Sequence, residues 1–204
     1  MYKLTLLTLL TLTIYSCSTD TKKSEKTNKV IITADSCKKW GLPPVNFEIV
    51  YPEDYTIEIN PTGGFYLQLR KVNGDTILQE LSFGRVEGTM DDEKLKRNLA
   101  YIDSVLNKTL NDHGQDYKTD FMGTGKFNDT TSVQIRATLD LVNVIRDKFI
   151  AHGEYKSLMT CVYSPTSTDQ AMMVSIISST KENIDSKTSL GTTTSEILKS
   201  FKLR

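Results

Sequence analysis

The sequence contains little of what several functional classes require. Its 204 residues include three cysteines, two histidines and one tryptophan, and its 25 lysines and arginines equal its 25 aspartates and glutamates. The zero formal net charge removes the strongly basic surface that non-specific nucleic-acid binding needs. Dedicated zinc sites take three or four ligands at close spacing, mostly cysteine and histidine, and no such spacing occurs. We therefore expect no nucleic-acid partner, metal or cofactor.

The sequence also lacks an apolar run long enough to cross a membrane. Its longest run, Leu4 to Ile14, contains only Leu, Thr and Ile and follows the positive Lys3. It is about half as long as the twenty or so apolar residues that a spanning helix needs. A positive residue before a short apolar segment is typical of an export signal, so residues 1–16 are predicted to be a signal peptide outside the fold.

The export signal ends in Ile14-Tyr15-Ser16-Cys17, which resembles the lipobox of bacterial lipoproteins. The resemblance implies cleavage before Cys17 after its thiol has received a diacylglyceryl group. It also implies an anchor in the bacterial cell envelope, at the inner or the outer membrane. Stable anchoring takes two or more acyl chains, such as palmitate. The alternative is an ordinary secretory signal followed by a chance cysteine.

Residues 17–29 are expected to form the lipidated cysteine and a flexible tether. Ser18 to Lys29 contains no apolar residue and carries four lysines against Asp20 and Glu25. Such a segment buries too little surface to offset the entropy lost on ordering it. Residues 30–204 are mildly acidic, show no internal repeat and contain no linker, which favours a single α+β domain.

Alternation of apolar and polar residues predicts an antiparallel β-sheet meander. The pattern is clearest over Thr131–Leu141, where Val133, Ile135 and their alternate neighbours are apolar. Further strands are expected at Phe47–Tyr51, Ile57–Ile59, Phe65–Leu69, Thr76–Phe83, Phe121–Phe127 and Tyr155–Tyr163. Turns are expected at Asn73-Gly74 and at Asn128-Asp129-Thr130. Ala171–Ser179 favours a strand, although its Met172-Met173-Val174 also allows a helix.

One long central helix and one short C-terminal helix are predicted beside the sheet. The long helix has Thr89 as a possible N-cap, ends at Gly114 and carries an apolar stripe at Leu95, Leu99, Ile102, Leu106 and Leu110. The acidic residues Asp91, Asp92 and Glu93 are interpreted as favourable charge in its first turn rather than as a cation site. The short helix is expected to be capped near Thr193 or Thr194.

The two ends of the domain resemble the PsbP-like fold. The first is Phe47-Glu48-Ile49-Val50-Tyr51-Pro52-Glu53-Asp54-Tyr55, and the last is Ile197-Leu198-Lys199-Ser200-Phe201-Lys202-Leu203. The resemblance implies an α/β/α sandwich, an antiparallel sheet between helical layers, from about Phe47 to Leu203. The family commonly has a long helix before the closing segment, whereas this chain is rich in Ser and Thr from Ser178 to Ser195. Family members are mostly non-catalytic, so the resemblance names a scaffold and no reaction.

Catalytic motifs are scarce. No Gly-x-Ser-x-Gly elbow occurs, and Gly63-Gly64 and Gly123-Thr124-Gly125 lack the Lys-Ser/Thr of a phosphate loop. His113 is interpreted as a residue at the negative end of the long helix, or as a metal ligand with Asp112 and Asp116. His152 is interpreted as a turn residue.

Cys37 and Cys161 would form an even pair once Cys17 is lipidated. In an oxidising envelope compartment they could form a disulfide that pins the N-terminal segment to the sheet. Buried or free thiols are the alternatives.

The function hypothesis is a membrane-anchored envelope lipoprotein that acts as a non-catalytic binding or assembly module. An envelope protein or glycan could contact aromatic residues such as Trp40, Tyr51, Tyr55, Phe65 and Tyr66, although most of these are expected in the core. The alternative is an envelope hydrolase that uses His113 or His152. A passive component of a larger envelope complex is the third possibility.

Overall fold

The computed structural model describes residues 26–86, 92–128, 130–146, 148–164, 167–182 and 190–204. The larger sheet comprises β3 (Thr56–Ile59), β4 (Phe65–Asn73), β5 (Thr76–Arg85), β6 (Asp116–Phe127), β7 (Thr130–Arg146), β8 (Phe149–Ser164) and β9 (Ser167–Ser179). The smaller sheet comprises β1 (Thr27–Ile32), β2 (Phe47–Pro52) and β10 (Lys202–Leu203). The helices are α1 (Ala34–Lys39), α2 (Asp92–Asp112) and α3 (Thr192–Ser200). The α+β class is confirmed, and Ala171–Ser179 lies in a strand. The predicted signal peptide and Cys17 lie outside the described residues.

The larger sheet is not the single meander that the sequence predicts. Its strand order is β3-β4-β5-β9-β8-β7-β6, so two antiparallel runs meet where β5 pairs with β9. The predicted strand at Phe47–Tyr51 lies in the smaller sheet instead. The physical reason is the connection between β5 and β6. It includes the 21-residue α2, which at about 1.5 Å per residue carries the chain to the far edge of the sheet.

The folded domain begins earlier than the predicted boundary at residue 30. Thr27 to Lys29, which were expected in the tether, pair with β2 in the smaller sheet. Backbone pairing needs no apolar side chain, which is why composition missed these residues. Lys29, Lys202 and Arg204 surround the Glu48 carboxylate of β2, and Lys29 Nζ lies 3.0 Å from Glu48 Oε2. The hydrogen bond from Lys29, with these nearby cations, lowers the pKa of Glu48.

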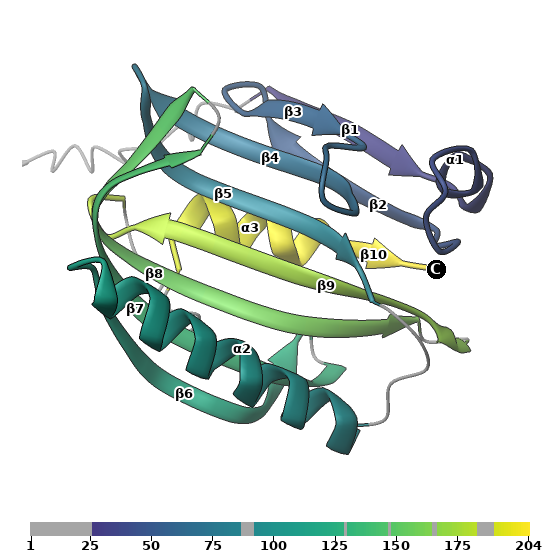
Figure 1. Ribbon diagram of the computed structural model, residues 1–204. Helices are drawn as coiled ribbons and strands as arrows, with labels where there is room; N and C mark the ends of the chain where they lie inside the picture. The colour runs from purple at the N-terminus through teal and green to yellow at the C-terminus, as the bar shows by residue number, and fades with distance from the viewer. Residues whose placement is uncertain (1–25, 87–91, 129, 147, 165–166, 183–189) are drawn as a thin grey trace, which may run out of the picture.

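Helices cover both faces of the larger sheet (Figure 1). On one face, α3 and the smaller sheet enclose the largest apolar cluster, which includes residues of β4, β5, β8 and β9. On the other face, α2 packs mainly on β6 and β7. Leu95 and Leu99 are completely buried there, as the predicted apolar stripe requires. The predicted long helix is therefore confirmed, but it lies toward one edge of the sheet.

An aromatic stack holds the larger sheet, the smaller sheet and the end of the chain together. The Phe83 ring of β5 lies 5.7 Å from the Phe47 ring of β2 and 5.6 Å from the ring of Phe201, which follows α3. Ser200 reinforces this contact, because its Oγ accepts from Val50 N at 2.9 Å and lies 3.0 Å from Val50 O. The closing Ser200-Phe201 segment therefore joins the two ends of the domain.

The ends of the helices agree only in part with the sequence predictions. Gly114, with a φ of 70°, follows α2 as expected, whereas the expected N-cap Thr89 lies outside the described residues. The N-cap of α3 is Gly191 rather than Thr193 or Thr194. A Cβ on Gly191 would lie 2.3 Å from Gln79 Nε2 and 2.6 Å from Ser178 Oγ, so the close approach to the sheet requires glycine.

Candidate functional site

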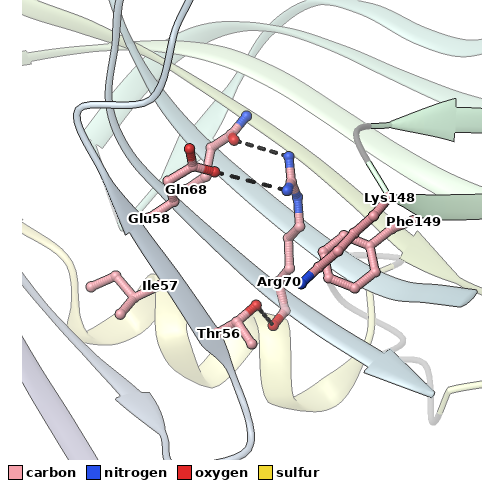
Figure 2. Close-up of a pocket in the computed structure, with 7 residues that line it drawn as sticks. All are labelled: Thr56, Ile57, Glu58, Gln68, Arg70, Lys148 and Phe149. Carbon is pink, nitrogen blue, oxygen red and sulfur yellow. Dashed lines mark hydrogen bonds and ion pairs between the residues drawn. The ribbon is translucent and has the colours of Figure 1, made fainter. Parts of the chain in front are cut away.

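A pocket of about 420 Å³ opens at one edge of the larger sheet, on the face that carries α2. It lies between β3, β4 and the turn from β7 to β8 (Figure 2). We call it the Arg70 pocket, and its lining residues are Thr56, Ile57, Glu58, Gln68, Arg70, Lys148 and Phe149. Its volume lies within the range of about 300–1,000 Å³ that is typical of small-molecule sites.

A buried ion pair forms the base of the Arg70 pocket. Arg70 Nε lies 2.6 Å from Glu80 Oε2, and the two residues are 8% and 3% exposed. Arg70 Nη2 also donates to Gln68 Oε1 at 3.0 Å, and Gln68 Nε2 donates to Ser82 Oγ at 3.1 Å. The register explains this arrangement, because Arg70 pairs with Glu80 and Gln68 with Ser82 across β4 and β5. The guanidinium is therefore held in a fixed position.

The turn between β7 and β8 brings an aromatic wall and a second cation to the pocket. Ile150 N donates to Asp75 O at 2.8 Å, which attaches the start of β8 to the turn before β5. The Phe149 ring centroid then lies 5.7 Å from Arg70 Cζ and 5.2 Å from Lys148 Nζ, distances typical of cation–π contacts. From β3, Glu58 Oε2 lies 3.9 Å from Arg70 Nη1. In Figure 2 the side chains of Glu58 and Gln68 point toward the guanidinium.

The charges of the described residues in and beneath the pocket balance. Arg70 and Lys148 supply two positive charges, and Glu58 and Glu80 supply two negative charges. The walls contain hydrogen-bond donors, acceptors and one apolar ring. Such a set suits an uncharged ligand that both donates and accepts hydrogen bonds. Its described lining residues include no histidine or cysteine that could act as a base or a nucleophile.

The structure places both histidines outside the pocket. His113 lies just after α2, as expected, whereas His152 lies within strand β8 and not in the turn that was expected. Both residues are exposed. Among the described residues, neither imidazole forms a hydrogen bond to a serine or a carboxylate. The backbone N–H of His152 donates to Tyr155 Oη at 3.2 Å. No group of three or more His, Cys, Asp or Glu in the described part of the chain could hold a metal ion.

The two remaining cysteines lie in different apolar clusters. Cys37 is buried in the cluster beneath α3, where its Sγ lies 3.6 Å from Val45 O, and burial raises the pKa of its thiol. Cys161 is buried in the cluster beneath the start of α2. Of the cysteines that the structure describes, both are thiols. The hypothesised disulfide between them is not formed in this structure.

Most of the aromatic residues suggested for partner contact belong to the core. Tyr51, Tyr55 and Tyr66 are at most 6% exposed. Trp40 and Phe65 are partly buried, and Trp40 packs against the cluster beneath α3. These side chains hold the fold together and offer little surface to a partner.

Two other motifs from the sequence have structural roles. Glu93 of the acidic trio pairs with Lys96 at 3.0 Å, while Asp91 lies outside the described residues. The Gly123-Thr124-Gly125 segment lies in β6, where a Cβ on Gly125 would approach Gln134 Oε1 to 2.5 Å.

No helix among the described residues is long and apolar enough to span a membrane.

Sequence reasoning missed the residues of the Arg70 pocket. Gln68 and Arg70 alternate with Leu67 and Leu69, and this pattern predicts polar side chains that face water. They are buried because a turn more than seventy residues later in the sequence lies over them. The only local signal was that Arg70 and Glu80, which have opposite charges, lie on the two strands that the Asn73-Gly74 turn joins.

Comparisons with known proteins show the fold. No family model and no curated protein matches the sequence. Five chains among the solved structures match, and the one described below shares the PsbP-like fold that the two ends of the sequence suggested. One of these structures is the solution structure of cyanobacterial PsbP (CyanoP) from Synechocystis sp. PCC 6803. It matches with a TM-score of 0.52 and 9% sequence identity, over 88% of this chain and 94% of that chain.

Removing one partner of the buried ion pair is expected to be costly. Arg70→Ala should lower the free energy of unfolding by about 3–5 kcal/mol, because the Glu80 carboxylate stays buried without its closest cation. The double variant Arg70→Met/Glu80→Leu should regain most of this loss, since it buries no charge. Urea denaturation measures both, with Lys108→Ala on the exposed side of α2 as the control. An Arg70→Ala protein as stable as the control would contradict the burial of this pair.

Proposed function

We propose that this chain is a lipoprotein of the bacterial cell envelope, anchored through Cys17, that acts as a non-catalytic binding or assembly module. The lipobox-like Ile14-Tyr15-Ser16-Cys17 and the short apolar run before it support the anchor. The polar residues that follow support a tether, which the start of β1 at Thr27 shortens by three residues. A tethered domain of this kind samples partners near the membrane surface.

The Arg70 pocket is the observation that carries the binding role. Its guanidinium is fixed by Glu80 and Gln68 before any ligand arrives, so binding would cost little side-chain ordering there. Its exposed groups, Glu58 and Lys148, can adjust to a ligand at the mouth. A fixed base and an adjustable rim favour recognition of one class of molecule.

An envelope glycan fits the pocket better than a charged ligand does. The balanced charges give no net attraction for an anion or a cation. A saccharide presents hydroxyl groups that both donate and accept, which matches the Arg70 donors and the Gln68 and Glu58 acceptors. The apolar C–H face of a sugar ring can pack on Phe149. The volume of about 420 Å³ suits a ligand about as large as a disaccharide.

The positions of the histidines favour the binding module over the hydrolase. General base catalysis needs an imidazole within about 2.6–3.2 Å of the proton that it removes, commonly in a concave site. His113 and His152 are both exposed, and neither lines the Arg70 pocket. No specific contact among the described residues supports a catalytic role for either histidine.

Cys17→Ser tests the anchor. Without the thiol, no diacylglyceryl group can be attached, so signal peptidase II should not process the precursor. We expect unprocessed precursor to accumulate and the mature form to disappear from the membrane pellet after fractionation. Ser18→Ala, one residue later, is the control and should be processed normally. A Cys17→Ser protein that is processed and sediments with membranes would contradict the lipoprotein assignment.

Titration with saccharides tests the pocket. We expect saturable binding of a disaccharide of N-acetylglucosamine or of soluble cell-wall glycan strands, measured by calorimetry. Glu58→Gln and Lys148→Gln should each weaken binding by about three- to tenfold, the worth of one hydrogen bond. The control is Lys108→Gln, which removes one positive charge, as Lys148→Gln does, but at an exposed site on α2. It should not change saccharide binding.

Two outcomes of the titration would contradict the glycan assignment. One is the absence of saturable binding by any saccharide tested. The other is equal binding by wild type and both pocket variants. If peptides released from the envelope bound in a Glu58-dependent manner while saccharides did not, the partner would be a protein.

A further inference from the structure

A second hollow lies beneath α2, on the same face of the larger sheet as the Arg70 pocket. Its volume is about 150 Å³. Leu106 and Leu110 of α2 line one side, and Leu139 of β7, Met159 of β8 and Ile177 of β9 line the other. Ile177, which lines the hollow, pairs across the strands with Glu80. The hollow therefore lies directly beside the buried ion pair of Arg70 and Glu80.

Polar contacts on one side of α2 explain why the helix does not close this hollow. Asp103 Oδ1 accepts from Tyr117 Oη at 2.5 Å and from Thr119 Oγ1 at 2.6 Å, both from β6. Asn111 Oδ1 accepts from Tyr117 N at 3.1 Å. These bonds fix the second half of the helix over β6, at the edge of the sheet. The side of the helix that faces β8 and β9 is then left with open space below it.

The burial along α2 agrees with this arrangement. Leu95 and Leu99, in the first half of the helix, are completely buried. Leu106 and Leu110, in the second half, are only partly buried although they continue the same apolar stripe. Side chains beside an empty space lose dispersion contacts on that side, and a ligand of matching shape would restore them.

The lining of the hollow defines a ligand class. The described lining residues carry no charge, and most are Leu, Ile, Val or Met. Ser157 of β8 and Ser175 of β9 add two hydroxyl groups. An apolar cavity of about 150 Å³ accepts a molecule the size of benzene. We propose that this hollow binds a single-ring aromatic molecule that carries one hydroxyl group, the phenol class, with the ring among the leucines and the hydroxyl group on Ser157 or Ser175.

This site is independent of the glycan proposal, because the two ligand classes differ in polarity and would bind to different residues. A sugar is too polar for the hollow beneath α2. A phenol lacks the several hydroxyl groups that the Arg70 pocket would satisfy. Failure of either proposal therefore leaves the other standing.

Titration with phenol and with toluene tests the proposal. The Cys17→Ser chain without the predicted signal peptide, residues 1–16, is used, so that neither an acyl chain nor the apolar signal segment requires a detergent that would compete for apolar sites. At ten times its Kd, phenol should raise the Tm by about 3–5 °C for a domain of this size. The NMR signals of the Leu106, Leu139 and Ile177 methyl groups should shift and saturate. Phenol should bind more tightly than toluene because only phenol can use the two serine hydroxyl groups.

Two variants make the test specific. Ser175→Leu should fill the hollow and weaken both probes by tenfold or more. Ser157→Ala/Ser175→Ala leaves the space open, so it should remove the preference for phenol while toluene binds as before. The double alanine variant also keeps the test valid if Ser175→Leu does not fold. Non-saturating methyl shifts, or equal phenol binding by wild type and both variants, would overturn the proposal.

Discussion

The aromatic stack of Phe47, Phe83 and Phe201 is the contact on which the rest of the structure depends. The three rings come from the smaller sheet, the larger sheet and the end of the chain, and their centroids lie 5.6–5.7 Å apart. Each such pair contributes about 0.5–1.5 kcal/mol beyond the area that it buries. Phe127 and Tyr66 extend the cluster. The smaller sheet and α3 fill this face, and both candidate sites lie on the opposite face.

The opposite face of the larger sheet is covered unevenly, and this unevenness produces both candidate sites. The helix α2 packs mainly on β6 and β7, while the turn between β7 and β8 lies over β4. The Arg70 pocket forms beneath that turn, where a buried guanidinium is neutralised by Glu80. The apolar hollow forms beneath the side of α2 that faces β8 and β9. The polar and the apolar candidate sites thus lie a few strands apart on one sheet.

Local patterns in the sequence predicted the elements but not their arrangement. The apolar stripe of α2, the Gly114 stop and the alternation in β7 depend on neighbouring residues, so they could be predicted. The pairing of β5 with β9 joins segments almost a hundred residues apart, and no local pattern encodes it. The burial of Arg70 could not be predicted for the same reason, since Phe149, whose ring lies beside the guanidinium, is more than seventy residues further along the sequence. The two end motifs indicated the PsbP-like fold because Ser200 and Phe201 must contact β2.

The central claim is that the protein meets its partner at the Arg70 pocket, and crosslinking in living cells tests this most directly. A photo-crosslinking residue would replace Thr56, an exposed residue of β3 that lines the pocket and pairs with Arg70 across the sheet. The matched control is Ile31, which is 60% exposed on β1 in the smaller sheet. We expect envelope adducts from position 56 and far fewer from position 31. Equal yields at the two positions, or adducts from position 31 alone, would contradict this claim.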